Sequence, residues 1–336
     1  MVRQYPLVLK NLKLYCQNLY RRKILRTNVV GAYSAVFYAT HKCNLDCLYC
    51  TQKNPEVTSD EVSTDDTIRI LRAIRRDVDT LLITGGEPLL RPDIVALARA
   101  ARRELKYRSV LLVTNGILLD KKRELLEHLT GLVVSLDSVI PDPSQSLSKP
   151  SVVSKVVENL MMVKTVWPPR SVTISAVVEG HNLDAMEGIL EFCREHDFVF
   201  SVQSAQAGKY PNYALLTNPR YRAFVEKVVA ARKTQPVNGT AKLLRTLLLY
   251  RDFTCYPTLF PRVNPNGDVF YPCEPLRKIA GNLLEDGSLR AIFARGRRLY
   301  GDIPECHSIC YLFGNVLSSF YVKDFWGFAG DTIRRG

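Results

Sequence analysis

The chain has 336 residues and a mass of 38.1 kDa, and 46% of its residues are hydrophobic and 9% aromatic. These fractions are typical of a globular protein and exclude a mainly disordered chain. The net charge of +13 favours anionic partners such as nucleic acid, lipid headgroups or phosphorylated compounds. We expect neither a secretory signal nor a spanning helix, because no apolar run reaches the roughly 20 residues that a bilayer requires.

Residues 1–30 are predicted to contain a basic amphipathic helix. They carry seven Lys or Arg and no acid. Apolar side chains recur there at the three- and four-residue spacing of one helical face. These residues are Val8, Leu12, Tyr15, Cys16, Leu19 and Tyr20. Such a helix suits an anionic membrane surface. The alternative is a leading helix that packs on the main domain and turns its charges to water.

From residue 35 to 204, short runs rich in Val, Ile and Leu alternate with helical stretches. The expected strands are 35–39, 80–84, 109–114, 132–136, 172–178 and 199–202. The expected helices between them lie near 63–76, 93–105, 120–129, 151–166 and 183–196, with Ser63 and Asp93 as N-terminal caps or first-turn acids. This alternation predicts an α/β fold with parallel strands. Six units are too few for a closed eightfold barrel, so we expect a partial (β/α)6 barrel over residues 31–250. Two more helices are expected at 218–233 and 240–251.

A cysteine loop follows the first expected strand, in the sequence His41-Lys42-Cys43-Asn44-Leu45-Asp46-Cys47-Leu48-Tyr49-Cys50. The carboxyl end of a parallel strand is where α/β folds place their binding sites. Three thiolates are one short of the four that complete an ordinary iron–sulfur cluster or structural zinc site. The pattern therefore favours a metal centre with one open position. A zinc knuckle or buried structural cysteines are the alternatives.

Small polar residues also stand at the ends of the later strands. They are Gly85, Gly86 and Glu87 after the second, Asn115 after the third, Ser135 and Asp137 at the fourth, Ser175 in the fifth and Gln203 in the sixth. The glycines permit close backbone approach to a ligand, and a carboxylate can pair with an ammonium group. Hydroxyl and amide groups can bind a ribose or a carboxylate. The alternative for each is an ordinary turn residue.

Residues 251–336 are rich in Pro, Gly, Cys and aromatics, and are expected to form a small cysteine-rich C-terminal domain. Pro265–Cys273 is predicted to form a hairpin that ends in a metal-ligating residue, Cys273. With Cys255, Cys306 and Cys310, Cys273 completes a set of four thiols, which is enough for one further cluster or for a zinc ion. Cys16 and Cys193 are expected in the core. The aromatic tail, which includes Phe325, Trp326 and Phe328, is expected to pack on the core, line a substrate cavity or meet a membrane.

CxxxCxxC after the first strand, with Tyr49 before its last cysteine and Gly85-Gly86-Glu87 one unit later, resembles the radical S-adenosylmethionine (radical SAM) family. The resemblance implies that Cys43, Cys47 and Cys50 hold a [4Fe–4S] cluster whose fourth iron binds the methionine part of S-adenosylmethionine. Glu87 and its glycines would bind the amino group, Ser135 and Asp137 the ribose, and Ser175 and Gln203 would lie near the adenine. The C-terminal cysteines resemble a shortened SPASM region and imply a probable second [4Fe–4S] auxiliary cluster.

The implied reaction is reductive cleavage of S-adenosylmethionine to a 5′-deoxyadenosyl radical, which abstracts hydrogen from a C–H bond. The basic N-terminus and aromatic tail favour an apolar, lipid-like or membrane-associated substrate. A peptide- or protein-modifying maturase is the alternative, and a non-catalytic, metal-stabilised nucleic-acid-binding module is an alternative of another class. We expect an electron donor such as ferredoxin or flavodoxin, no nucleic acid partner, and a cytoplasmic protein with membrane contact through its N-terminal helix. The sequence assigns no catalytic side chain.

Overall fold

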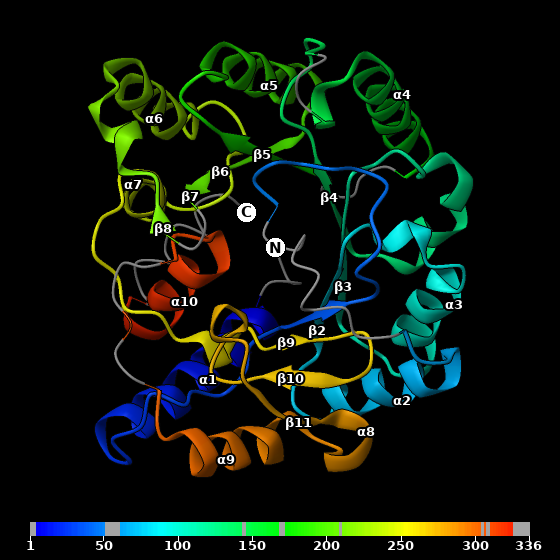
Figure 1. Cartoon of the computed structure of the whole chain (residues 1–336), viewed down its shortest axis with the longest axis vertical. Helices are drawn as coiled ribbons and strands as arrows, with labels where there is room; N and C mark the ends of the chain where they lie inside the picture. Colours follow the sequence, from blue (N-terminus) through cyan, green and yellow to red (C-terminus); the bar gives the residue numbers. More distant parts are fainter. Residues whose placement is uncertain are drawn as a thin grey trace.

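Nine strands form one sheet in the order β11-β10-β9-β1-β2-β3-β4-β5-β6 in the computed structural model of the chain (Figure 1). The structure describes residues 5–324 except 51–60, 143–145, 168–171, 208–209, 304–305 and 307–309. The parallel strands are β1 (Ala35–Tyr38), β2 (Thr80–Thr84), β3 (Ser109–Thr114), β4 (Gly131–Ser135), β5 (Val172–Val178) and β6 (Val199–Ser204). The six expected strands are confirmed, and their ends move by at most two residues.

Helices cover the outside of these strands, as Figure 1 shows. They are α2 (Thr64–Arg75), α3 (Ile94–Arg99), α4 (Pro150–Val166), α5 (Leu183–His196), α6 (Pro219–Ala231) and α7 (Ala241–Leu248). The partial (β/α)6 barrel is thereby confirmed. Two expected helices differ in form: α3 continues to Glu104 as a π-helical turn, and Asp120–His128 is a 3₁₀ segment with a kink at Lys122.

The C-terminal region extends the same sheet. The expected hairpin is present, with β9 (Arg262–Val263) antiparallel to β10 (Asp268–Phe270), followed by β11 (Ile279–Asn282). β9 pairs in parallel with β1, so the hairpin is added at the free edge of the barrel. Helices α8 (Leu283–Asp286), α9 (Leu289–Tyr300) and α10 (Phe313–Lys323) complete the region. A two-stranded ribbon of β7 (Gln206–Ala207) and β8 (Tyr210–Pro211) stands apart.

The buried core also crosses the boundary expected near residue 250. Phe37 and Ile70 of the barrel share one apolar cluster with Val263, Val269 and Tyr271 of the C-terminal region. The division into two domains stays a prediction of the sequence, because sheet and core are both continuous there. The predicted aromatic residues Phe325, Trp326 and Phe328 lie outside the described residues.

The N-terminal helix is present as α1 (Tyr5–Lys23) and packs against α10. Its buried side differs from the expected face. Leu14 packs on a small cluster with Val30 and Val322, and the buried side chain of Asn18 accepts a hydrogen bond from the Gly31 amide at 2.8 Å. Residues 14 and 18 are one turn apart and define a different face. Cys16 is therefore exposed and its expected place in the core is wrong, whereas Cys193 is fully buried as expected.

No helix within the described parts of the chain has both the length and the apolar character to cross a bilayer.

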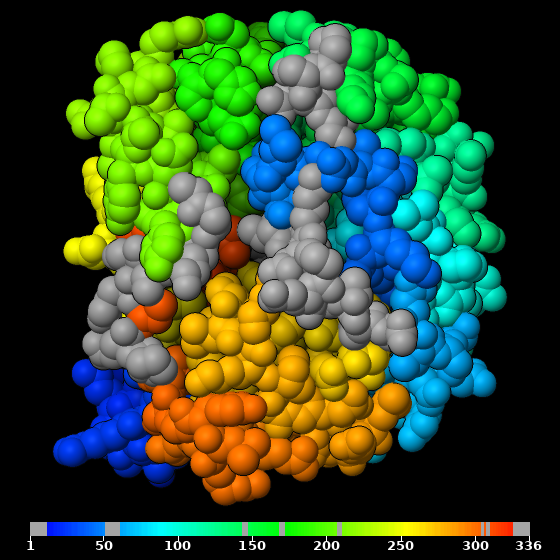
Figure 2. All heavy atoms as spheres, in the orientation of Figure 1, coloured from blue at the N-terminus to red at the C-terminus, as the bar shows by residue number. Residues whose placement is uncertain are grey.

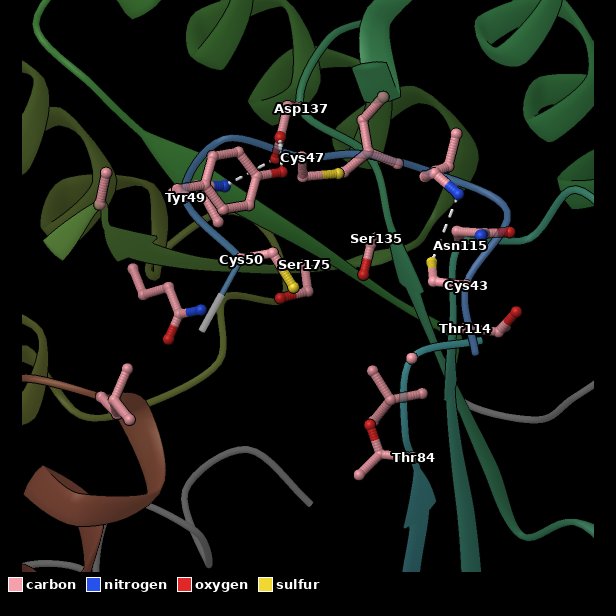
Figure 3. A pocket seen from close by; sticks show the side chains of 18 of the residues that line it. Cys43, Cys47, Tyr49, Cys50, Thr84, Thr114, Asn115, Ser135, Asp137 and Ser175 are labelled. Carbon is pink, nitrogen blue, oxygen red and sulfur yellow. Dashed lines mark hydrogen bonds between the residues drawn. The ribbon is translucent and has the colours of Figure 1, made fainter. Parts of the chain in front are cut away.

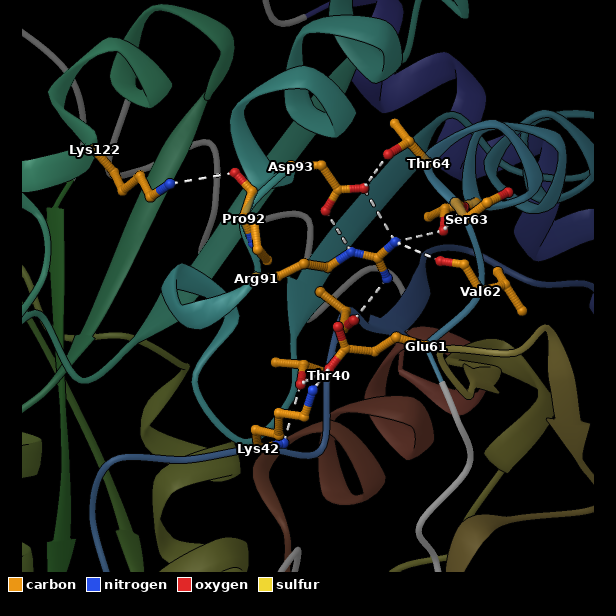
Figure 4. Close-up of polar contacts among 12 residues, drawn as sticks. Thr40, Lys42, Glu61, Val62, Ser63, Thr64, Arg91, Pro92, Asp93 and Lys122 are labelled. Carbon is orange, nitrogen blue, oxygen red and sulfur yellow. Dashed lines mark hydrogen bonds and ion pairs between the residues drawn. The ribbon is translucent and has the colours of Figure 1, made fainter.

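Arg91 joins the first two βα units (Figure 4). Its side chain is 2% exposed and its guanidinium donates to the carbonyls of Ala39 and Val62, at 2.9 and 3.2 Å, and to the Thr67 hydroxyl at 2.7 Å. Asp93 accepts from Arg91 Nε at 2.7 Å. Asp93 does stand at the start of α3, but its side chain makes no cap hydrogen bond there, whereas Ser63 caps α2 as expected. Arg91 thus fixes the end of β1, from which the cysteine loop departs.

We expect Arg91→Met to lower the free energy of unfolding by about 3 kcal/mol, because it removes the buried partner of a partly buried ion pair and the donor to the carbonyls of Ala39 and Val62. Urea unfolding measures this. The control is Arg69→Met, which removes an exposed pair with Asp66 and should change stability by less than about 1 kcal/mol. Equal losses in both variants would contradict the role given to Arg91.

The stability contributed by this pair should also depend on pH. Burial acts to raise the pKa of Asp93, but hydrogen bonds from Arg91 and Thr64 and the charge of Arg91 outweigh it and hold the pKa below its usual value. A carboxylate with a lowered folded-state pKa stabilises the fold above its unfolded-state pKa, and this stability is lost as the pH falls through the folded value. The difference between wild type and Arg91→Met should therefore narrow below about pH 4.

Candidate functional site

A cavity of about 270 Å³ lies at the carboxyl ends of the parallel strands (Figure 3). The predicted site residues that line it are Cys43, Cys47, Tyr49, Cys50, Gly85, Gly86, Asn115, Ser135, Asp137, Ser175 and Gln203. They come from the loop after β1 and from the ends of β2 to β6. Because the strands are parallel, their polar ends meet on one side of the sheet and can act on one ligand.

The two glycines after β2 admit the chain's own cysteine loop. The Gly86 amide donates to the carbonyl of Thr40 at 2.8 Å, and the Glu87 amide donates to the carbonyl of Lys42 at 2.7 Å. A Cβ at Gly85 would overlap the Thr40 carbonyl oxygen, and one at Gly86 would overlap that of Lys42. The sequence predicted close approach to a ligand. In the structure, the glycines also permit the contact that positions the cysteines.

Glu87 is fully buried beneath the cavity wall. Its carboxylate accepts hydrogen bonds from the amides of Leu89 and Asn115, at 2.9 and 2.7 Å, and from the hydroxyl of Thr114 at 2.7 Å. Burial raises the pKa of this carboxyl, and the three hydrogen bonds oppose the rise. Glu87 therefore ties the turn after β2 to the end of β3. Its expected contact with an amino group of the cofactor stays a prediction.

Two side-chain contacts hold the rest of the cysteine loop. Asn115 Nδ2 donates to Asn44 Oδ1 at 2.8 Å, and the Tyr49 hydroxyl donates to Asp137. The other oxygen of Asp137 accepts from the Val177 amide at 2.8 Å. The loop is thus fastened to the ends of β3 and β4. The sequence did not single out Asn44, and no local pattern marks it, since its partner lies two βα units later.

Cys47 and Cys50 are half-buried, whereas Cys43 is exposed. Burial and the charge of Asp137 raise the pKa of Cys47 to about 11, and burial raises that of Cys43. A thiolate at such a site needs a compensating positive charge, which an iron–sulfur cluster provides. Three thiols on one loop suit a cluster that keeps one iron open. Among the described residues, no group of three or more His, Cys, Asp or Glu side chains is arranged to hold a metal ion.

The four C-terminal cysteines lie near one another. The Cys255 amide donates to the carbonyl of Cys306 at 3.1 Å. Burial, together with the negative charges of Cys306, Cys273 and Cys310, raises the pKa of the Cys255 thiol to about 12, so all four are within electrostatic reach. Hairpin β9–β10 delivers Cys273, as the sequence predicted. That these four residues bind a metal stays a prediction.

A buried polar cluster beside Cys273 was not predicted. Tyr38, the last residue of β1, donates its hydroxyl to Glu274 at 2.8 Å, and Arg262 of β9 pairs with the same carboxylate oxygen. Both Glu274 and Tyr38 are buried. The cluster links the strand that leads to the first set of cysteines with the residue next to Cys273. Its members are far apart in sequence, so no motif announces it.

Residues 37–193 match the family model of the Radical SAM superfamily. A probable GTP 3′,8-cyclase of Methanocaldococcus jannaschii is 32% identical over 161 residues, which cover 46% of this chain and 53% of that protein. Residues 37–193 therefore form a radical SAM domain. A GTP 3′,8-cyclase of Clostridium perfringens is 30% identical over 217 residues, 61% of this chain and 66% of the relative. The chain spans about half the length of the curated relatives it matches.

Solved structures agree on the fold. SuiB of Streptococcus suis, bound to its precursor peptide SuiA, superposes with a TM-score of 0.61 and 21% identity over 82% of this chain and 68% of that one. anSMEcpe with AdoMet and the Cp18Cys peptide gives 0.61 and 16% over 91% of this chain and 100% of that one. The matched domain implies a [4Fe–4S] cluster and S-adenosylmethionine as cofactors. A non-catalytic nucleic-acid-binding module is thereby set aside.

The contact between the glycines and the cysteine loop gives a testable result. We expect Gly86→Ala to displace Lys42, to lower the free energy of unfolding by about 2–3 kcal/mol, and to reduce the iron bound per chain after anaerobic reconstitution. The matched control is Gly180→Ala, where the added Cβ would lie an ordinary 3.6 Å from Leu215. Iron binding by Gly86→Ala at the level of the control would show that the loop does not depend on this contact.

Proposed function

We propose that the chain cleaves S-adenosylmethionine reductively and removes a hydrogen atom from a C–H bond of an organic substrate. The observation that supports this most directly is that the three cysteines of CxxxCxxC line one cavity together with the polar ends of β2 to β6. When bound, the reduced cluster and S-adenosylmethionine supply one-electron cleavage of the sulfonium and hydrogen-atom abstraction, giving methionine, 5′-deoxyadenosine and a substrate radical.

The residues of the chain divide the work of binding. Cys43, Cys47 and Cys50 would hold the cluster. Ser135 and Gln203 offer a hydroxyl and an amide on the cavity wall for the nucleoside part of S-adenosylmethionine, and Ser175 lies in the same wall. Apolar side chains fill the spaces between them. These are Leu45, Val113, Leu147, Val177 and Leu312. They limit the access of water to the reacting atoms, which a reactive radical requires.

We assign a second [4Fe–4S] cluster to Cys255, Cys273, Cys306 and Cys310. A full shell of four thiolates suits electron transfer or structure rather than activation of a cofactor. Leu312, two residues beyond Cys310, lies in the wall of the cavity, so this region adjoins the first site. A zinc ion with the same ligands is the alternative. The electron would come from an external donor such as ferredoxin or flavodoxin.

For the substrate we favour an apolar or lipid-like molecule at a membrane. The supporting observation is that the end of α1 is basic and that Tyr20, Ile24 and Leu25 are exposed there. A peptide substrate is the second candidate. It is supported by the likeness in fold to SuiB and anSMEcpe, both solved with peptides and both aligned over more than four-fifths of this chain. A peptide substrate would make the chain a maturase.

The first experiment is anaerobic iron and sulfide analysis with electron paramagnetic resonance. We expect about eight irons in the wild type and about four in a Cys43/Cys47/Cys50→Ala variant. Addition of S-adenosylmethionine should change the spectrum of the wild type but not that of the Cys43/Cys47/Cys50→Ala variant. A wild-type protein that binds zinc and no iron would exclude the proposed reaction.

A matched variant separates the two sites. Replacement of Cys255, Cys273, Cys306 and Cys310 by Ala should also leave about four irons. The spectral response to S-adenosylmethionine should remain in this variant. With dithionite as the reductant, the wild type should release 5′-deoxyadenosine and methionine, whereas the Cys43/Cys47/Cys50→Ala variant should release none. If the quadruple variant instead keeps as much iron as the wild type, the four residues bind zinc or have a purely structural role.

A further inference from the structure

The end of α1 and the chain just beyond it expose a group of large apolar side chains. Leu19 is 37% exposed, Tyr20 55%, Ile24 65% and Leu25 51%. Single exposed apolar residues are common on soluble proteins, but four within seven residues are an unusual concentration, which we call the apolar patch.

Cations lie near this patch and come from α1, from the segment just after it and from α9. Arg21, Lys23 and Arg26 lie in the same stretch as the apolar residues. Across from them, α9 contributes Arg290, Arg297 and Arg298, all exposed. We call these six cations with Leu19, Tyr20, Ile24 and Leu25 the α1–α9 surface. Helix α1 runs toward the lower left of the molecule and α9 lies along the bottom (Figure 1), and their atoms adjoin at the lower left in the space-filling view (Figure 2).

A cavity of about 680 Å³ lies between the two helices, larger than the one at the cysteine loop. Tyr20 and Leu25 line one side of it, and Arg290, Arg297 and Arg298 line the other. Two acids meet these arginines, since Asp302 pairs with Arg297 at 3.2 Å and Asp77 lies 3.8 Å from Arg290. Six cations against two carboxylates leave the surface strongly positive.

The two helices form one fixed surface. Asp302, just after α9, accepts hydrogen bonds from the hydroxyl of Thr27 and the amide of Asn28, at 3.0 and 3.3 Å. The side chain of Asn28 donates in return to the carbonyl of Ile303 at 3.1 Å. These contacts join the segment after α1 to the end of α9. The apolar patch and the arginines of α9 are therefore held in register.

We propose that the α1–α9 surface docks on an anionic lipid bilayer, with Ile24 and Leu25 entering the acyl region and the arginine-lined cavity receiving a headgroup phosphate. A bilayer offers apolar and anionic groups side by side in one plane, and amphipathic cationic helices bind it through both. Nucleic acid would use the cations but leave the aliphatic side chains in water. A second copy of the chain would present the same positive charge and be repelled. The proposal deepens the membrane-associated part of the proposed function.

Vesicle sedimentation tests the proposal on the full-length, reconstituted protein. We expect wild type to bind vesicles of phosphatidylcholine mixed with phosphatidylglycerol, and not vesicles of phosphatidylcholine alone. Arg26→Glu/Arg298→Glu should weaken binding by about tenfold or more, since each cation near an anionic surface adds to the attraction. Ile24→Ser/Leu25→Ser should weaken it by a similar factor through the loss of apolar insertion.

The control is Lys121→Glu/Arg123→Glu, which makes the same change in net charge at exposed residues of the 3₁₀ segment between β3 and β4. It should bind vesicles as the wild type does. Equal loss in the control would show that only total charge matters. Full vesicle binding by Ile24→Ser/Leu25→Ser would also overturn the proposal. So would single-stranded RNA that displaces the vesicles from the wild type and binds Ile24→Ser/Leu25→Ser as tightly as the wild type.

Cleavage of S-adenosylmethionine by the same preparations separates this proposal from the proposed reaction. All four proteins should release 5′-deoxyadenosine with dithionite at the same rate, because the substituted residues lie outside the cysteine cavity. Vesicle binding without cleavage would leave the surface assigned and the reaction rejected. Cleavage without vesicle binding would support the proposed reaction and reject the proposed docking surface.

Discussion

Two backbone hydrogen bonds, from Gly86 to Thr40 and from Glu87 to Lys42, determine where the cysteine loop lies. They require that the turn after β2 pass within hydrogen-bonding distance of the loop after β1, and only glycine leaves room for that approach. Glu87 then fixes the same turn to the end of β3 through its buried carboxylate. Gly85, Gly86 and Glu87 thus connect the ends of β1, β2 and β3. The position of the thiols depends on this packing.

The remaining anchors of the loop are side-chain contacts to later strands. Asn44 is held by Asn115, and Tyr49 by Asp137. Each partner stands at the carboxyl end of its strand, where parallel topology gathers chain ends that are distant in sequence. The same topology places Arg91 under the start of the loop. A mutation in any of these supports would therefore affect the position of the thiols without touching them.

Much of the barrel could be predicted from sequence because its strands are covered on both faces and read as unbroken apolar runs. Ser63 was identifiable as a cap because capping depends on local chemistry. The pairing of β9 with β1 could not be predicted, since short strands late in the chain carry no signal for their partner. The buried face of α1 was misjudged because apolar residues occur on more than one of its faces. Arg91 was missed, although an acid two residues later is a usable sign of a buried arginine.

Leu312 has a consequence for how the protein is assembled. The three cysteines of the first loop belong to the first fifty residues, but the cavity that they line receives part of its wall from Leu312, near the other end of the chain. During synthesis the loop and the strand ends around it can fold while that part of the wall is still missing. The cavity is therefore more open in the growing chain than in the finished protein. Leu312 is synthesised after every other residue that lines the cavity, so its docking completes the wall last.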